Sequence, residues 1–175
     1  ILRDIFISSI SRINNIDEDS ARAVYQELLA IHDNDRWTNI LRGHYSRILP
    51  DESKHSTIWL IDYKNLKNNT FTVTNQFTVE AAKTRRADCV VFVNGIPLVV
   101  IEAKSPVSSK DKAGEAFDQI KQYEQEVPRL FYSNLFNLIT NGYSVLYGAT
   151  GSPSDYWAEW RDPYPKTQAD FRDKF

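Results

Sequence analysis

Two apolar runs that meet at Asn94-Gly95 constrain this chain more than any other segment. The first run follows Asp88, and the second ends in Glu102 and Lys104. Asn-Gly between two apolar runs is a strong signal for a β-hairpin, and near-continuous apolar character is typical of strands buried on both faces. Charged side chains at the ends of buried strands are rare unless they are paired or bind a metal. The hairpin therefore predicts a site built from Asp88, Glu102 and Lys104.

The register of this hairpin decides whether the two acids share a face. Glu102 and Lys104 are two residues apart, so both leave the same face of their strand. A two-residue turn that pairs residue 93 with residue 96 sets Glu102 opposite Ala87 and turns Asp88 to the other face. A three-residue loop that pairs residue 93 with residue 97, or a β-bulge, sets Asp88 opposite Glu102. A functional site requires one of these last two arrangements.

The two acids favour a metal ion between them, because neighbouring carboxylates repel and one takes up a proton unless a cation is present. Mg²⁺ prefers carboxylate oxygens and usually binds one or two of them together with water and substrate phosphates. We therefore expect Mg²⁺ on Asp88 and Glu102, with the backbone carbonyl of Ala103 as a further ligand. Such a metal acidifies a bound water and polarises a phosphate. Lys104 could position or deprotonate that water, or neutralise charge on the phosphate. A solvent-exposed ion pair is the alternative interpretation of Glu102 and Lys104.

A second acid-x-lysine triplet, Asp62-Tyr63-Lys64, lies at the end of another predicted strand. Its upstream acids are in a polar loop, and a polar turn rather than a helix follows it. We therefore interpret this second triplet as structural.

The helix predicted at residues 112–126 supports the site at the hairpin. Gln119 and Tyr123 are four residues apart and share a face at the edge of its apolar stripe. Gln119 could orient a water or Lys104, and Tyr123 could contact a phosphate, although a surface glutamine and an amphipathic tyrosine are the alternative. Basic residues near the two strands could bind DNA phosphates, or form only a solvated loop. These residues are Lys83, Arg85, Arg86, Lys110 and Lys112.

The remaining pattern predicts an α/β fold of α+β-like character. Residues 1–48 have helical apolar periodicity in three stretches, the last from Arg36 to Ile48, with Ser20 or Asp17 capping the second. Further segments predict strands. The expected architecture is a mixed central β-sheet flanked by helices, with an N-terminal helical layer. The predicted strands outside the hairpin lie at residues 57–62, 71–80, 135–140 and 144–147.

Length and composition are typical of one globular domain, since 42% of the 175 residues are hydrophobic and 25% are charged. We expect this domain at residues 1–150, with the helical layer at 1–48 and the core at 56–150, and a tail or linker at 151–175. The single cysteine, Cys89, excludes an internal disulfide framework, and the three histidines lack zinc-ligand spacing.

The use of a single cysteine favours a reducing compartment, and we expect a cytoplasmic protein. No apolar run approaches transmembrane length, so we expect no membrane segment. The formal charge of −2 means that any DNA contact must use a local basic patch. The first residue is isoleucine and the chain has no methionine, so we expect a fragment of a longer protein.

The order of these motifs, Asp…Glu-x-Lys followed by a helix with Gln-x-x-x-Tyr, resembles the PD-(D/E)xK nuclease superfamily in its RecB-like branch. Further segments resemble the N-terminal nuclease domain of the R subunits of type I restriction enzymes, and the stretch that leads into Glu-x-Lys is the most specific. These segments are residues 59–62, 73–77, 92–104 and 128–131.

The resemblance implies a restriction-endonuclease-like core that cleaves double-stranded DNA with Mg²⁺, in a complex with modification and specificity subunits. ATP use is implied only for a motor region outside this chain, which lacks a Gly-x-x-x-x-Gly-Lys-Ser/Thr loop. The resemblance also implies a catalytic set of Asp88, Glu102 and Lys104, with Gln119 and Tyr123 as auxiliary residues.

The chain departs from the family pattern at two points. Ala87 stands where the family usually has proline before the aspartate. The family also has further residues before the helix with which this chain begins, including an acidic position that can support the metal site, and no residue of this chain can be assigned to that position. Two other functions therefore stay open: a repair or recombination nuclease of the same superfamily, and a non-catalytic DNA-binding or docking module with this fold.

Overall fold

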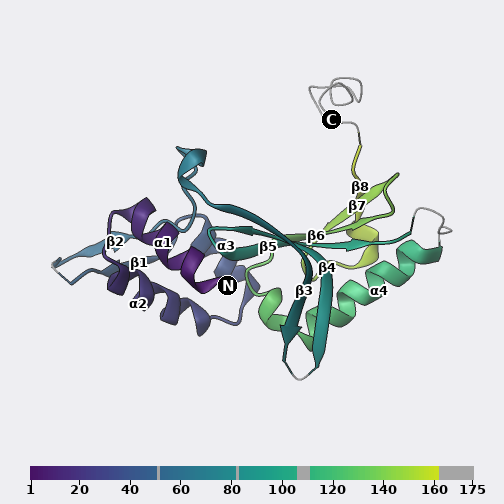
Figure 1. Cartoon of the computed structure of the whole chain (residues 1–175), viewed down its shortest axis with the longest axis horizontal. Coiled ribbons are helices and arrows are strands. Elements are labelled where there is room, and N and C mark those ends of the chain that lie inside the picture. Colours follow the sequence, from purple (N-terminus) through teal and green to yellow (C-terminus); the bar gives the residue numbers. More distant parts are fainter. Residues whose placement is uncertain (51, 82, 106–110, 162–175) are drawn as a thin grey trace.

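The chain forms an N-terminal helical layer beside a six-stranded sheet that has a long helix on one face (Figure 1). The structure is a computed structural model that describes residues 1–50, 52–81, 83–105 and 111–161, without the side chains of 111 and 112. In chain order, its elements are α1 (Arg3–Asn14), α2 (Glu18–Leu29), α3 (Asn34–Leu41), β1 (Ser46–Ile48), β2 (His55–Thr57), η1 (Leu66–Asn68), β3 (Phe71–Glu80), β4 (Thr84–Val93), β5 (Ile96–Ala103), α4 (Asp111–Glu126), η2 (Pro128–Leu130), β6 (Phe136–Thr140), β7 (Val145–Ala149), η3 (Ser154–Tyr156) and β8 (Ala158–Glu159).

The six-stranded sheet is mixed, which confirms the predicted α/β fold. Its strand order is β3-β4-β5-β6-β7-β8, and each neighbouring pair is antiparallel except β5 and β6. α4 connects these two parallel strands, as a parallel pair requires a crossover connection. The crossover places α4 on one face of the sheet, directly after the strand that carries Glu102.

Two apolar cores stabilise these parts. In the first core, α1, α2 and α3 pack against one another and against Ile96 and Leu98 of β5. In the second core, one face of the sheet packs against α4 through residues that include Val90, Val100 and Ile120. Full burial of one such side chain contributes about 1.5–3 kcal/mol. β5 takes part in both cores, so the strand that carries Glu102 is fixed from two directions.

The N-terminal helices confirm the predicted helical layer, but the third predicted helix is too long. Asp17 caps α2 by accepting a hydrogen bond from the backbone N–H of Ser20 at 2.8 Å. α3 ends at Leu41 rather than at Ile48, because Gly43 turns the chain with a φ of 93°, which is a conformation that favours glycine. The residues that follow form β1, which pairs with β2.

The prediction of a strand at residues 57–62 is wrong beyond residue 57, where the chain becomes an irregular segment with Ile58, Leu60 and Ile61 buried. Leu60 is almost fully buried, which explains the apolar pattern. The backbone N–H of Trp59 donates to Asn14 Oδ1 at 2.7 Å, and Asn94 Nδ2 donates to the carbonyl of Leu60 at 2.7 Å. These side chains satisfy backbone groups, including the buried carbonyl of Leu60, that a strand ladder would otherwise pair.

The other predicted elements are present, as β3, β6, β7 and α4, with ends within two residues of those predicted. Beyond residue 150, β8 pairs with β7 and extends the same sheet. Trp157 packs edge-on against Phe117 of α4 with ring centroids 5.5 Å apart. The division of the chain at residue 150 stays a prediction. Among the described helices, none combines the length and apolarity needed to cross a membrane.

Candidate active site

The turn of the β4–β5 hairpin is the two-residue form, not the three-residue loop. Asn94 and Gly95 have φ of 52° and 76°, and positive φ at both central residues is what a type I′ turn requires. Val93 consequently pairs with Ile96. If this register continued unchanged, Asp88 would lie on the face opposite to Glu102.

A β-bulge restores the pairing that a site requires. The register shifts by one between residues 91 and 92, which leaves Leu98 as an extra residue of β5. Beyond the bulge the pairs run to Cys89 with Ile101, and one further step of this register would set Asp88 opposite Glu102; the Asp88 carboxylate lies near enough to Glu102 to raise its pKa. Of the two arrangements that the sequence allowed for a site, the structure contains the bulge.

Asp88 is held by one donor from each neighbouring strand. Its Oδ2 accepts a hydrogen bond from the backbone N–H of Ala103 on β5 at 2.9 Å. Its Oδ1 accepts one from Nε2 of Gln76 on β3 at 3.3 Å. Both donors are neutral, so they orient the carboxylate without neutralising its charge.

Glu102 is a buried acid with an unpaired oxygen. Its side chain is 2% exposed, and its Oε1 accepts a hydrogen bond from Lys104 Nζ at 3.0 Å. Its Oε2 is buried and has no hydrogen-bond partner among the described residues. Burial raises the pKa of Glu102; the Lys104 ammonium opposes that rise and the Asp88 carboxylate adds to it. The alternative of a solvent-exposed ion pair is therefore wrong.

A chain of hydrogen bonds connects Lys104 to α4 and then to β4. Lys104 Nζ donates to Gln119 Oε1 at 2.6 Å, and Gln119 Nε2 donates to the hydroxyl oxygen of Tyr123 at 2.5 Å. The Tyr123 hydroxyl donates to the carbonyl of Arg86 at 3.2 Å. The four-residue spacing places both α4 side chains on the face toward the sheet. The structure thus brings together the five predicted catalytic residues, Asp88, Glu102, Lys104, Gln119 and Tyr123.

The site offers the donor atoms that a hard divalent cation prefers. The backbone N–H of Ala103 points toward Asp88 on β4. The N–H and C=O groups of one residue point to the same side of a strand, so the carbonyl of Ala103 also faces β4. Two carboxylates and a carbonyl suit Mg²⁺ better than a transition metal. In residues 1–161, apart from the gaps given above, no three or more His, Cys, Asp or Glu side chains form a metal-binding group. The site therefore fits a cation that takes few protein ligands.

Two of the predicted DNA-binding residues pair with an acid at the end of α4. Lys83 Nζ lies 2.6 Å from Oε1 of Glu126, and Arg85 binds the other carboxylate oxygen. Arg85 and Lys83 together lower the pKa of Glu126 to about 2. These pairs fasten the end of the β3–β4 hairpin to the helix that carries Gln119.

The other three predicted DNA-binding residues have different positions. Arg86 is exposed on β4, two residues before Asp88. Lys110 lies outside the described residues, and so does the side chain of Lys112. DNA binding by all five basic residues stays a prediction.

Sequence reasoning missed Gln76 and Glu126. For Gln76 the available signal was the uncertain alternation of β3 near Asn75. For Glu126 the signal was an acid at the end of the predicted helix, with the basic residues Lys83 and Arg85 earlier in the chain. Arg85 is 41 positions from Glu126 in the sequence. Neither signal identifies a partner without the fold.

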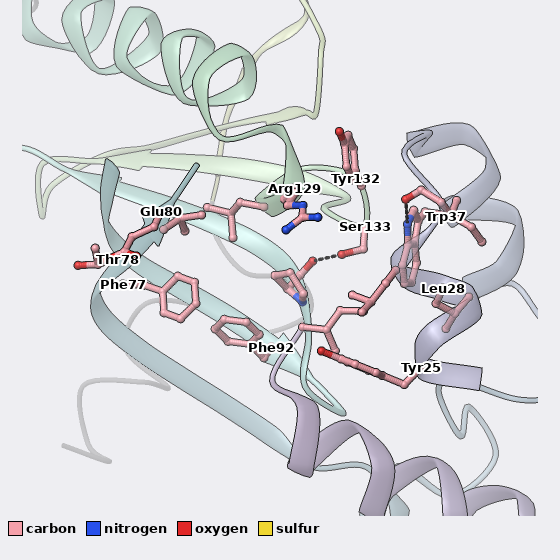
Figure 2. Close-up of a pocket in the computed structure, with 16 residues that line it drawn as sticks. Tyr25, Leu28, Trp37, Phe77, Thr78, Glu80, Phe92, Arg129, Tyr132 and Ser133 are labelled. Carbon is pink, nitrogen blue, oxygen red and sulfur yellow. Dashed lines mark hydrogen bonds between the residues drawn. The ribbon is translucent and has the colours of Figure 1, made fainter. Parts of the chain in front are cut away.

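A hollow of about 390 Å³ lies between the N-terminal helices and strands β3 and β4, and neither Asp88 nor Glu102 lines it (Figure 2). Figure 2 shows Phe92 on one side of it, Trp37 on the other and Arg129 between them. No member of the predicted catalytic set lines this hollow. Gln119 and Tyr123 line a separate surface hollow of about 400 Å³ along α4.

Comparison with known proteins gives one consistent family. The family described as "Type I restriction enzyme R protein N terminus" matches residues 1–156. A protein of Methanocaldococcus jannaschii that carries the name type I restriction enzyme MjaIXP endonuclease subunit is 32% identical, over 91% of this chain and 16% of its own length. The type I restriction enzyme HindI endonuclease subunit of Haemophilus influenzae is 31% identical, over 63% of this chain and 11% of its own length. The type I restriction enzyme SauCOLORF180P endonuclease subunit of Staphylococcus aureus is 31% identical, over 71% and 14%. The chain thus spans less than a fifth of the length of these relatives.

Proposed function

Because the chain belongs to the family of type I restriction enzyme R protein N-termini, we propose that it is the Mg²⁺-dependent nuclease domain of such an enzyme. In this proposal it hydrolyses phosphodiester bonds of double-stranded DNA. The observation that carries the proposal is the buried Oε2 of Glu102, which has no partner among the described residues, with the charge of Asp88 beside it. A buried, unpaired carboxylate oxygen is unfavourable in a purely structural role. A bound cation would compensate for it.

The proposed ligands of Mg²⁺ are the carboxylates of Asp88 and Glu102 and the carbonyl of Ala103. When bound, the ion supplies the positive charge that acidifies a water and polarises the scissile phosphate. Asp88 presents its carboxylate in one orientation, because both of its oxygens accept hydrogen bonds. Glu102 is kept from solvent by burial, which strengthens its interaction with a cation.

The proposed role of Lys104 is to offset charge on the phosphate. Its Nζ donates to both Glu102 and Gln119, so its position is fixed at the edge of the carboxylate pair. A fixed donor of this kind favours electrostatic stabilisation of a transition state. Gln119 and Tyr123 act through Lys104, since their hydrogen bonds tie its ammonium to α4 and β4.

The rest of the proposed activity depends on parts outside this chain. We expect modification and specificity subunits to select the DNA. We expect ATP to be bound and hydrolysed by a motor region of the longer subunit, and the complex to work in the cytoplasm. The chain covers 16% or less of the relatives named above, which leaves room for such a region. Of the predicted DNA-binding residues, Lys83 and Arg85 pair with Glu126, whereas Arg86 is exposed near Asp88, so the proposal assigns a contact with a DNA phosphate to Arg86.

Glu102→Gln tests the proposal, since it keeps the shape of the side chain and removes its charge. In the complete restriction complex we expect DNA cleavage to fall more than about a hundredfold, with ATP hydrolysis retained. Glu80→Gln, a change at an exposed acid of β3, is the matched control and should cleave normally. Normal cleavage by Glu102→Gln would overturn the proposal and favour a non-catalytic DNA-binding or docking module.

A further inference from the structure

Gln76 has a backbone conformation that is unusual for its place in a strand. Its φ is 51°, in the left-handed region that residues other than glycine rarely adopt. The pairs on either side are regular, since Asn75 pairs with Cys89 and Phe77 pairs with Ala87. A strained residue inside an otherwise regular ladder points to a local requirement.

In β3 and β4, the alternation of side chains between the two faces of the sheet is interrupted near Gln76 and Asp88. Val73 is 66% exposed, yet Phe77 packs against the core between the sheet and α4, although residues four apart on a regular strand share a face. On β4, Ala87 and Val90 are both buried in that core, although they are three positions apart and would lie on opposite faces of a regular strand. The change of phase on β4 thus falls at Asp88 or next to it.

The side chain of Gln76 completes the hydrogen bonding of Asp88. The N–H of Ala103 holds one carboxylate oxygen at 2.9 Å, which leaves rotation about the terminal bond of Asp88 restricted at one end only. Such terminal torsions are broad when unrestrained. The Gln76 amide holds the second oxygen at 3.3 Å and therefore fixes the plane of the carboxylate.

We propose that Gln76 is a positioning residue that orients the Asp88 carboxylate for metal binding, and that its left-handed backbone exists to place the amide there. This inference rests on the nuclease function proposed above. Gln76 does not bind the metal or the DNA in this scheme. Partners that orient metal ligands in this way typically change metal affinity or activity by about 10–100-fold when they are removed.

Gln76→Gly separates positioning from structural support. Glycine adopts positive φ without strain, so the variant should be at least as stable toward urea as the wild type when no metal is present. We expect its affinity for Mn²⁺, measured by calorimetry on the 175-residue chain, to fall about tenfold. In the complete complex, kcat for cleavage should fall by a similar factor while KM for DNA stays unchanged.

Asn75→Gly is the matched control, because it places glycine at the neighbouring exposed position without touching Asp88. It should bind Mn²⁺ with wild-type affinity. Wild-type Mn²⁺ affinity and kcat in Gln76→Gly, with Glu102→Gln inactive, would overturn the positioning role and leave the nuclease proposal standing. A wild-type chain that binds no Mn²⁺, together with normal cleavage by Glu102→Gln, would overturn both.

Discussion

Two acid-x-lysine triplets, at residues 62–64 and 102–104, have the same spacing but opposite surroundings. Glu102 is buried, its Oε2 has no hydrogen-bond partner in the described part of the chain, and burial raises its pKa. Asp62 lies in a turn and accepts hydrogen bonds from the backbone N–H groups of Lys64 at 2.9 Å and Asn65 at 2.8 Å, and from the Asn68 side chain at 2.9 Å. The bond from Asn65, then the one from Asn68, hold the pKa of Asp62 below its usual value.

The difference shows that the role of a carboxylate depends on which of its lone pairs stay available. Asp62 uses its oxygens to shape the turn, as Asp side chains commonly do. Glu102 keeps an oxygen, Oε2, to which no described residue donates a hydrogen bond. The interpretation of residues 62–64 as structural, made from the polar turn that follows them, agrees with these contacts.

The largest expected difference between the two triplets is in DNA cleavage after the lysine ammonium of each is removed. Lys104→Met and Lys64→Met both keep an unbranched stem. We expect Lys104→Met to lower the initial rate of plasmid cleavage by the complex about 10²–10³-fold, because Glu102 and the phosphate lose a fixed cation. Lys64→Met should cleave at the wild-type rate. Equal losses in the two variants would show that the triplets are not functionally distinct.

For the free energy of unfolding we expect the reverse order: a change beside Asp62 should lower it more than a change beside Lys104. Asn69 is buried, accepts a hydrogen bond from the N–H of Asp62 at 2.9 Å and donates to its carbonyl at 2.8 Å. Asn69→Ala leaves these groups unpaired, so we expect the free energy of unfolding to fall by about 1–3 kcal/mol in urea denaturation. Gln119→Ala, beside Lys104, should lower it less, since water can reach the groups that lose a partner. A larger loss in Gln119→Ala would reverse the ranking.

The smallest expected effect is in the pH dependence of stability, measured with a chelator present. The pKa of Asp62 is lowered, so its contribution is present above the usual value of 3.8 and is lost as the pH falls through the lowered value. The pKa of Glu102 is raised, so its contribution is present below 4.5 and is lost as the pH rises through the raised value. Subtracting the curves of Asp62→Asn and Glu102→Gln from that of the wild type should give slopes of opposite sign. Two slopes of the same sign would contradict the opposite pKa shifts of Asp62 and Glu102.

The sheet and the proximity of Glu102 to Lys104, and of Gln119 to Tyr123, could be predicted because they depend on local spacing. Asn94-Gly95 defines a hairpin, and residues two apart on a strand or four apart on a helix share a face. The choice of bulge over longer loop could not be predicted, since Leu98 is placed by contacts with the helical layer. The pair of Arg85 with Glu126 and the burial of Leu60 likewise depend on segments that are distant in the sequence.

The bulge at Leu98 also gives the two strands unequal tolerance to changes in length. A one-residue deletion in β5 between the turn and Ile101 can close the bulge, and Cys89 then still pairs with Ile101, which keeps Asp88 next to Glu102. A one-residue deletion in β4 between Asp88 and the turn has no spare residue to absorb it, and it carries Asp88 to the wrong face. Among natural or engineered variants of this hairpin, we therefore expect shortened forms of β5 to keep the carboxylate pair and shortened forms of β4 to lose it.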